Sequence, residues 1–123
     1  MTLTKPRILV VDDEEMLTEL YRHVLESGGE FVVEAVNKGT VVLQTAREFH
    51  PDLILLDCNM PDRTGAEIAE ELSDAADLQG VTIAYMTGDS FEEGTLRGLP
   101  SFPKPMSLDD LRVMARKLLA RRA

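Results

Sequence analysis

The chain has 123 residues, of which 44% are hydrophobic, so it has the size of one domain with a core of its own. Its 22 acidic and 13 basic residues give a formal net charge of −9, which repels nucleic-acid phosphates and anionic lipid headgroups. No uninterrupted apolar run exceeds four residues, whereas a membrane-spanning helix needs about 20. We therefore expect one domain over residues 1–123 that lies in the cytoplasm and binds neither nucleic acid nor membrane.

Strands and helices alternate in the first half of the chain. The continuous apolar run at residues 8–11 predicts a strand buried on both faces. Apolar residues then recur at helical spacing over residues 14–28, where a glycine pair ends the pattern. A second strand is predicted at residues 31–35, and a second helix lies within residues 39–51.

The alternation continues toward the C-terminus. Residues 53–56 and 81–86 predict two more buried strands, separated by a loop at 59–65 and a helix around residues 68–72. Residues 90–99 have no clear pattern.

The last two elements are a short strand and a helix. The strand is predicted at residues 101–102, where the flanking prolines are compatible with the edge of a sheet. Ser107 with Asp110 three residues later forms a capping-box pattern, which predicts the start of the last helix.

Five strands that alternate with helices predict an α/β fold, a flavodoxin-like doubly wound sandwich of three layers. Its parallel sheet is expected in the order 2-1-3-4-5, with ligands bound beyond the carboxyl ends of the strands. Polar residues follow four of the five strands: Asp12, Asp13, Asp57, Thr87 and Lys104. No site residue is expected after the second strand, because the predicted order places that strand at an edge, away from the crevice.

The chemistry of these residues points to a phosphoryl group. Three carboxylates in one crevice repel one another and need protonation or a cation, and a set of oxygen ligands alone suits Mg²⁺. A lysine and a threonine hydroxyl supply the positive charge and the donor that phosphoryl oxygens require. No glycine-rich nucleotide loop is present, so the expected acceptor is a carboxylate of the protein itself.

Four segments, in their order and spacing, carry a resemblance to a known family. They are the apolar run into Asp12-Asp13, the segment Asp57 to Gly65, Thr87 at the end of the fourth strand, and Lys104-Pro105 after the fifth. Over about residues 7–119 the chain resembles the CheY-like receiver domain of bacterial two-component response regulators.

The resemblance implies a phosphoacceptor and a magnesium site. Asp57 would take a phosphoryl group from a histidine kinase or a histidine phosphotransfer protein, and the signal would pass to a downstream target. Asp13, Asp57 and the backbone carbonyl of Asn59 would bind Mg²⁺ directly, and Asp12 would bind it through water. Such a domain is not an enzyme for other substrates, because it catalyses only its own phosphorylation and dephosphorylation.

The resemblance also implies roles for four residues further along the chain. Lys104 would contact the phosphoryl oxygens, and Thr87 would move toward them on activation. Asp89, together with Asn59, would flank the path of the hydrolytic water. The Lys104-Pro105 peptide bond is expected to be cis.

The chain departs from the family pattern on its expected switch surface. Relatives usually carry Tyr or Phe three residues before the lysine, where this chain has Ser101. The interval from Thr87 to Lys104 is 17 positions (104 − 87), a few fewer than usual, so the fourth helix is expected to be short or irregular.

Two other functions stay open on the sequence alone. A degenerate receiver would bind its partner without phosphorylation, which Ser101 favours and the complete acidic set disfavours. A Mg²⁺-dependent phosphohydrolase with an aspartyl-phosphate intermediate would usually place a second Asp two residues after the acceptor, where this chain has Asn59. Uptake of one phosphoryl group from acetyl phosphate would separate these functions.

Overall fold

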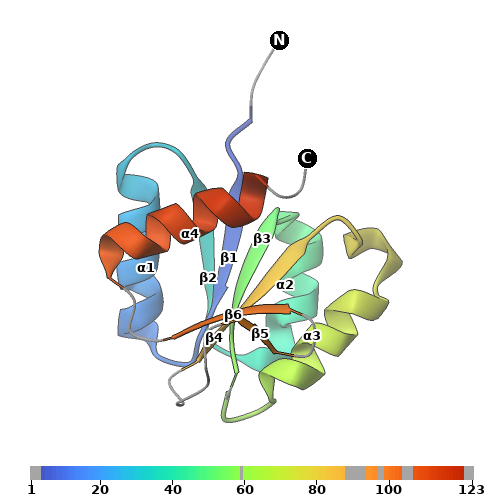
Figure 1. Ribbon diagram of the computed structural model, residues 1–123. Helices are drawn as coiled ribbons and strands as arrows, with labels where there is room; N and C mark the ends of the chain where they lie inside the picture. Colours follow the sequence, from blue (N-terminus) through green and yellow to red (C-terminus); the bar gives the residue numbers. More distant parts are fainter. Residues whose placement is uncertain (1–3, 59, 88–93, 97–98, 104–106, 121–123) are drawn as a thin grey trace.

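Strands and helices alternate along the chain as far as the fourth strand, as the sequence predicts. The computed structural model describes residues 4–58, 60–87, 94–96, 99–103 and 107–120 (Figure 1). The elements are β1 (Arg7–Val11), α1 (Glu15–Ser27), β2 (Val32–Val36), η1 (Gly39–Val41), α2 (Val42–Phe49), β3 (Leu53–Asp57), α3 (Gly65–Asp74), η2 (Ala76–Leu78), β4 (Thr82–Thr87), β5 (Gly94–Leu96), β6 (Leu99–Pro103) and α4 (Leu108–Ala120). None of the helices in these ranges combines the length and the apolarity that a bilayer crossing requires.

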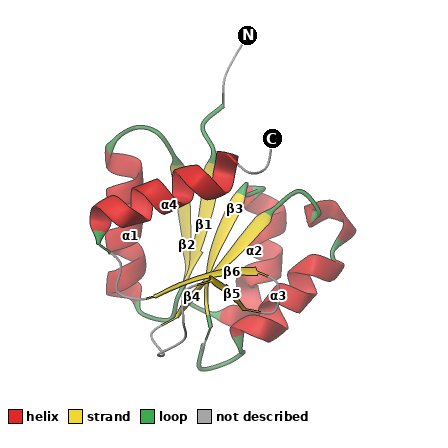
Figure 2. Ribbon diagram, in the orientation of Figure 1, coloured by secondary structure: helices red, strands yellow, loops and turns green. Residues whose placement is uncertain are grey.

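One sheet forms the middle layer, with helices on both faces (Figure 2). Its strand order is β2-β1-β3-β4-β6-β5, and every neighbouring pair is parallel except β5 with β6. The five parallel strands follow the predicted order 2-1-3-4-5, so the expected flavodoxin-like fold is confirmed. Helices α1 and α4 pack together on one face, and α2 and α3 pack together on the other.

The two faces of the sheet bury two separate apolar clusters. Alternate residues of β1 and β3 point to opposite sides, as the period of a strand requires. Leu9 and Ile54 pack with α2 and α3, whereas Ile8 and Leu53 pack with α1 and α4. All five residues of β3 are buried, which explains why its sequence is a continuous apolar run without alternation.

The connection between β4 and β6 contains a strand that the sequence did not predict. Of residues 88–98 the structure describes 94–96, which form β5, and the expected short or irregular fourth helix falls on the residues outside the described ranges. It pairs antiparallel with β6, with Gly94 opposite Ser101 and Leu96 opposite Leu99. This pairing satisfies backbone groups of β5 that would otherwise lack a partner in the sheet.

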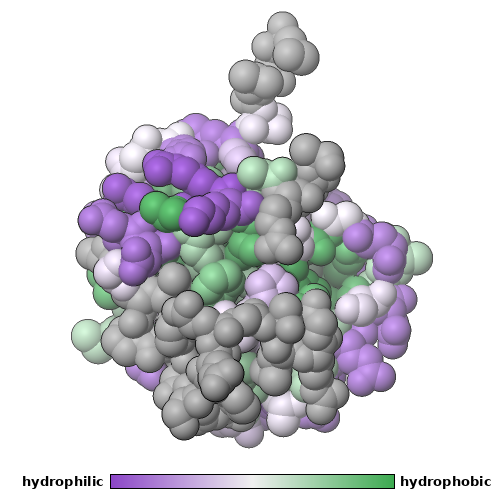
Figure 3. All heavy atoms as spheres, viewed as in Figure 1, coloured by the Kyte–Doolittle hydropathy of each residue, from purple (hydrophilic) through white to green (hydrophobic). Residues whose placement is uncertain are grey.

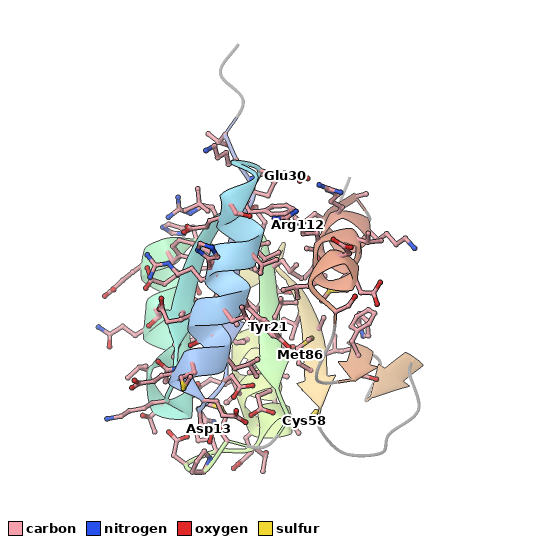
Figure 4. The ribbon with its side chains drawn as sticks, turned by 90° about the vertical axis from the view of Figure 1, so that its left-hand side faces the viewer. Asp13, Tyr21, Glu30, Cys58, Met86 and Arg112 are labelled. Carbon is pink, nitrogen blue, oxygen red and sulfur yellow. The ribbon has the colours of Figure 1, made fainter. Side chains whose placement is uncertain are left out.

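Two arginines of α4 hold this helix against the end of α1. Arg112 donates to the backbone oxygen of Val24 at 2.9 and 3.1 Å, which satisfies one of the last carbonyl groups of α1. Arg116 forms a two-pronged ion pair with Glu30, and this hydrogen-bonded partner lowers the pKa of the Glu30 carboxyl. Figure 4 shows Arg112 and Glu30 close together at one end of the molecule.

Candidate functional site

Acidic side chains gather at the carboxyl edge of the sheet, between β1 and β3. The parallel register sets Val11 beside Leu56, so the next residues, Asp12 and Asp57, emerge next to each other. Carboxylate oxygens of Asp12, Asp13 and Asp57 all lie within 4.8 Å of one another. The structure therefore brings together the three carboxylates that the sequence predicted to converge.

The three carboxylates differ in their access to solvent. Asp12 and Asp57 are only 2% and 4% exposed, whereas Asp13 is exposed at the rim. Figure 4 shows Asp13 and Cys58 at the same end of the sheet, opposite the end that carries Glu30 and Arg112. The cluster thus combines two buried acidic residues with one that is exposed to solvent.

The donor set fits a hard divalent cation. Three negative charges at this spacing repel one another, by about 4 kcal/mol per pair at 4 Å when the effective dielectric constant is about 20. The three donors are carboxylate oxygens, the ligands that Mg²⁺ prefers, and neither His nor Cys belongs to the cluster. Cys58 packs into the apolar cluster beneath α2 and α3, so its sulfur belongs to the core. The residues present therefore fit Mg²⁺.

The turn after β1 is held by hydrogen bonds on both sides. A carboxylate oxygen of Asp12 accepts from the backbone N–H of Glu14 at 3.0 Å, and the Asp12 N–H donates to Val36 of β2 at 3.1 Å. The side-chain amide of Asn37 donates to the backbone oxygen of Asp12 at 2.8 Å and to the hydroxyl of Thr18 at 3.0 Å.

Asn37 corrects one expectation drawn from the sequence. No site residue was expected at the end of the second strand, but Asn37 follows β2 directly and contacts the backbone of Asp12. The available signal was a polar residue directly after a strand, the same signal that identified the other site residues. Its place in a turn-forming segment concealed this role.

Asp62, in the loop between β3 and α3, is a second residue that the sequence pattern does not reveal. Its carboxylate accepts the backbone N–H groups of Gly39 and Thr40, each at 3.0 Å. The bond from Gly39 is the main cause that lowers the pKa of Asp62. Bonds from a side chain to a distant backbone leave no periodic signal in a sequence.

The same loop is closed at several further points. Gly65 donates its N–H to the Cys58 oxygen at 2.7 Å, and Met60 donates to the Arg63 oxygen at 3.2 Å. Thr64 and Glu67 then form a reciprocal capping box, which explains why α3 begins where it does. The segment between Asp57 and α3 is thus a compact loop anchored to the end of β3.

The remaining predicted site residues lie at or beyond the limits of the described ranges. Thr87 closes β4, beside the strand that carries Asp57, and the structure describes its backbone. Asn59, Asp89, Lys104 and Pro105 lie outside the described residues. Their expected roles, including the cis peptide bond before Pro105, stay predictions.

Ser101 lies in the interior of the sheet. It is 3% exposed in β6 and sits beside Tyr85 of β4, which is 1% exposed. A groove of about 310 Å³ adjoins this region, and the described residues that line it are Ala66, Ala69, Glu70, Ser73, Tyr85 and Leu99. The position that usually carries an aromatic ring is therefore occupied here by a small, buried side chain.

The outward surface of helix α4 is polar. Figure 3 shows hydrophilic side chains across the outward side of this helix. Val113 is an exception, since it is 43% exposed. The described surface of α4 thus resembles an ordinary solvated helix face.

Comparison with known proteins agrees with this geometry. The polar-differentiation response regulator DivK of Brucella ovis is 32% identical over 80 residues, which are 65% of this chain and 64% of DivK. The phosphate regulon transcriptional regulatory protein PhoB of Rhizobium meliloti is 31% identical over 121 residues, or 94% of this chain and 53% of PhoB. The matches thus span less than two thirds of the length of these relatives.

Solved structures show the same fold at lower sequence identity. A CheY-like receiver domain protein from Methanospirillum hungatei JF-1 has a TM-score of 0.83 at 23% identity, with 97% of each chain covered. The receiver domain of the Francisella response regulator 1452 has a TM-score of 0.83 at 20% identity, with 97% of this chain and 100% of that chain covered. Residues 8–116 match the family described as response regulator receiver domain, and the chain therefore belongs to that family.

Proposed function

We propose that the chain is the phosphoacceptor of a His–Asp phosphorelay and that Asp57 is the acceptor. The observation that carries this proposal is the convergence of Asp12, Asp13 and Asp57 within 4.8 Å at the carboxyl edge of the sheet. Asp57 ends the central strand β3, so the best-buried part of the fold holds its backbone in place.

The proposed reaction moves a phosphoryl group from a phosphohistidine to Asp57. A carboxylate oxygen attacks the phosphorus, and the bond between phosphorus and the imidazole nitrogen breaks. The electron pair of that bond stays on the nitrogen, which takes up a proton. Mg²⁺ bound by Asp12, Asp13 and Asp57 would supply the positive charge that lets an anion approach a phosphoryl group.

Each residue of the cluster has its own task in this scheme. Asp57 provides the nucleophile from a nearly buried position, where neighbouring groups rather than bulk water define its surroundings. Asp12 and Asp13 supply negative charge that attracts the cation, and the turn bonds of Asp12 orient its carboxylate. In the proposed scheme Lys104 and Thr87 bind the phosphoryl oxygens.

The proposal includes a partner class and excludes turnover of an outside substrate. The donor would be a histidine kinase or a histidine phosphotransfer protein in the cytoplasm, and a downstream target would receive the signal. The protein would act only on itself, through its own phosphorylation and hydrolysis. Asn59, which stands where a phosphohydrolase usually has its acid, favours this function over an aspartyl-phosphate enzyme.

Intact-mass spectrometry with acetyl phosphate tests the proposal. We expect a gain of one phosphoryl group in the presence of Mg²⁺, no gain with EDTA, and no gain in Asp57→Asn. Asp77→Asn is the matched control, because Asp77 is a surface carboxylate paired with Arg47 at 3.1 Å. A wild-type chain that stays unmodified with Mg²⁺ would favour the degenerate receiver, and labelling of Asp57→Asn at the wild-type rate would identify another acceptor.

A further inference from the structure

We propose that the connection between β2 and α2 positions both halves of the acidic site. This clamp, as we call it, consists of Asn37, Gly39 and Thr40. It holds the turn of Asp12 on one side and the loop after Asp57 on the other. The inference rests on the proposed function in one respect: it concerns the affinity of the site for Mg²⁺.

The first arm of the clamp is the side chain of Asn37. Its amide donates to the backbone oxygen of Asp12 at 2.8 Å and to the hydroxyl of Thr18 at 3.0 Å. Thr18 is 1% exposed in α1, and its hydroxyl donates to the backbone oxygen of Glu15. Asn37 therefore joins the end of β2 to the acidic turn and to the first turns of α1.

The second arm is a pair of backbone N–H groups. Those of Gly39 and Thr40 both donate to the carboxylate of Asp62, each at 3.0 Å. Asp62 belongs to the loop between Asp57 and α3. This arm therefore connects the start of η1 with the loop that follows Asp57.

The connection between the two arms has little freedom. Gly39 is buried, and a Cβ atom at this position would lie 3.0 Å from Ile68 and 3.1 Å from both Arg63 and Asp62. The chain is thus packed directly against the loop and against α3. Asn37 and Thr40 are only three positions apart in the sequence, so a shift of one arm displaces the other.

A metal ion that binds Asp12 or Asp13 on one side and Asp57 on the other should bind more tightly because of this arrangement. Ligands that are already at the right separation lose less freedom when the ion binds. Outer partners that orient the ligands of a metal typically change its affinity by about 10-fold to 100-fold when they are removed. Breaking either arm should therefore weaken Mg²⁺ binding, even though neither Asn37 nor Asp62 belongs to the carboxylate cluster.

Two variants separate positioning from simple electrostatics. Asn37→Asp adds a negative charge and removes the donor to Asp12, whereas Asp62→Glu keeps its charge but alters the reach of the carboxylate. Electrostatics alone predicts tighter Mg²⁺ binding for the first variant and no change for the second. The clamp predicts weaker binding for both, on the order of 10-fold in the dissociation constant.

Calorimetric titration with MgCl₂ is the measurement, and matched substitutions control for chemistry. Gln44→Glu adds a charge on α2, and Asp77→Glu lengthens a surface carboxylate that pairs with Arg47. Both controls should bind Mg²⁺ as the wild type does. The double variant Asn37→Asp/Asp62→Glu should lose less affinity than the product of the two single losses, because one broken arm already releases the other.

Unfolding in urea without Mg²⁺ separates positioning from stability. If Asn37→Asp and Asp62→Glu lower the urea midpoint but bind Mg²⁺ at least as tightly as the wild type, the clamp is wrong while the proposed function stands. If the wild type itself binds no Mg²⁺, the clamp and the proposed function are both wrong. Asp62 is exposed, so Asp62→Glu can be folded and titrated even if Asn37→Asp fails to fold.

Discussion

Gly65 lies so close to Asp57, the proposed acceptor, that a Cβ atom at position 65 would be 2.6 Å from the backbone oxygen of Asp57. It would also lie 2.8 Å from the Cα atom of Cys58, and both neighbours are backbone atoms that cannot rotate away. The close approach allows the Gly65 N–H to reach the Cys58 oxygen at 2.7 Å. The first residue of α3 therefore helps to define where the acceptor backbone lies.

Gly65→Ala should consequently displace the acceptor and destabilise the fold. Overpacking against fixed backbone costs about 1 to 3 kcal/mol in the free energy of unfolding. Phosphorylation by acetyl phosphate should slow as well, because the carboxylate moves with its backbone. Urea unfolding and intact mass measure the two effects.

Gly28→Ala is the matched control for this substitution. Nothing lies within 4 Å of a Cβ atom at Gly28, and its φ of −85° suits any residue. It should leave phosphorylation unchanged and stabilise the fold slightly, by about 0.4 to 1 kcal/mol. Equal effects of the two glycine substitutions would contradict the role of Gly65.

Asp57→Asn should stabilise the protein when Mg²⁺ is absent. Removing one of three clustered charges relieves two pairwise repulsions of about 1 to 4 kcal/mol each, the range between bulk water and a protein surface for charges near 4 Å apart. Mg²⁺ should raise the urea midpoint of the wild type and have much less effect on this variant. A lower midpoint for Asp57→Asn in EDTA would show that the cluster is not strained by its charges.

Sequence patterns predicted the strands well where both faces are buried. The runs in β1, β3 and β4 are apolar at nearly every position, and the residues that end them, Asp12 and Asp57, proved to be neighbours. The sequence did not identify Asn37 and Asp62 as site residues, because hydrogen bonds to distant backbone groups leave no periodic pattern in a sequence. Strand β5 was not predicted, because its three residues, one of them glycine, are too few to show the alternation of a strand.

The stability of the fold should fall in acid partly through Asp62. Backbone N–H donors lower its pKa below 3.8 in the folded state, so the unfolded chain binds the proton more tightly. The contribution of the Asp62 carboxylate to the free energy of unfolding is therefore complete above about pH 4. It is lost as the pH falls through the pKa of Asp62 in the folded state. Urea midpoints between about pH 2.5 and pH 6 should show a smaller loss for Asp62→Asn than for the wild type.

Arg112 and Arg116 should differ in their contributions although both tie α4 to the region of α1. Arg112 is half-buried and satisfies the Val24 carbonyl, so Arg112→Met should cost about 1.5 to 3 kcal/mol in the free energy of unfolding. The Arg116 side chain is 54% exposed, and its pair with Glu30 should contribute less than about 1 kcal/mol. Urea unfolding of both Met variants would test the order, and 1 M salt should weaken only the Arg116 pair appreciably.

Signal output should bypass the surface around β6. The family resemblance implies that an aromatic ring at the position of Ser101 would change its place as Thr87 moves, which would make a two-state element. Ser101 is 3% exposed and packed beside Tyr85, which is itself buried, so this position has neither the bulk nor the room for such a change. The described residues between β4 and β6, 94–96, form a short strand that pairs with β6.

We therefore expect beryllium fluoride, a phosphoryl mimic, to change the amide chemical shifts unevenly when Mg²⁺ is present. Large changes should occur at Asp13, Asp57 and the clamp residues Gly39 and Thr40, which donate to Asp62 in the loop after Asp57. Changes across residues 99–102 should be clearly smaller, because Ser101 has no ring that could switch between two packed positions. Shifts in β6 as large as those at Asp57 would show instead that this strand still transmits the signal.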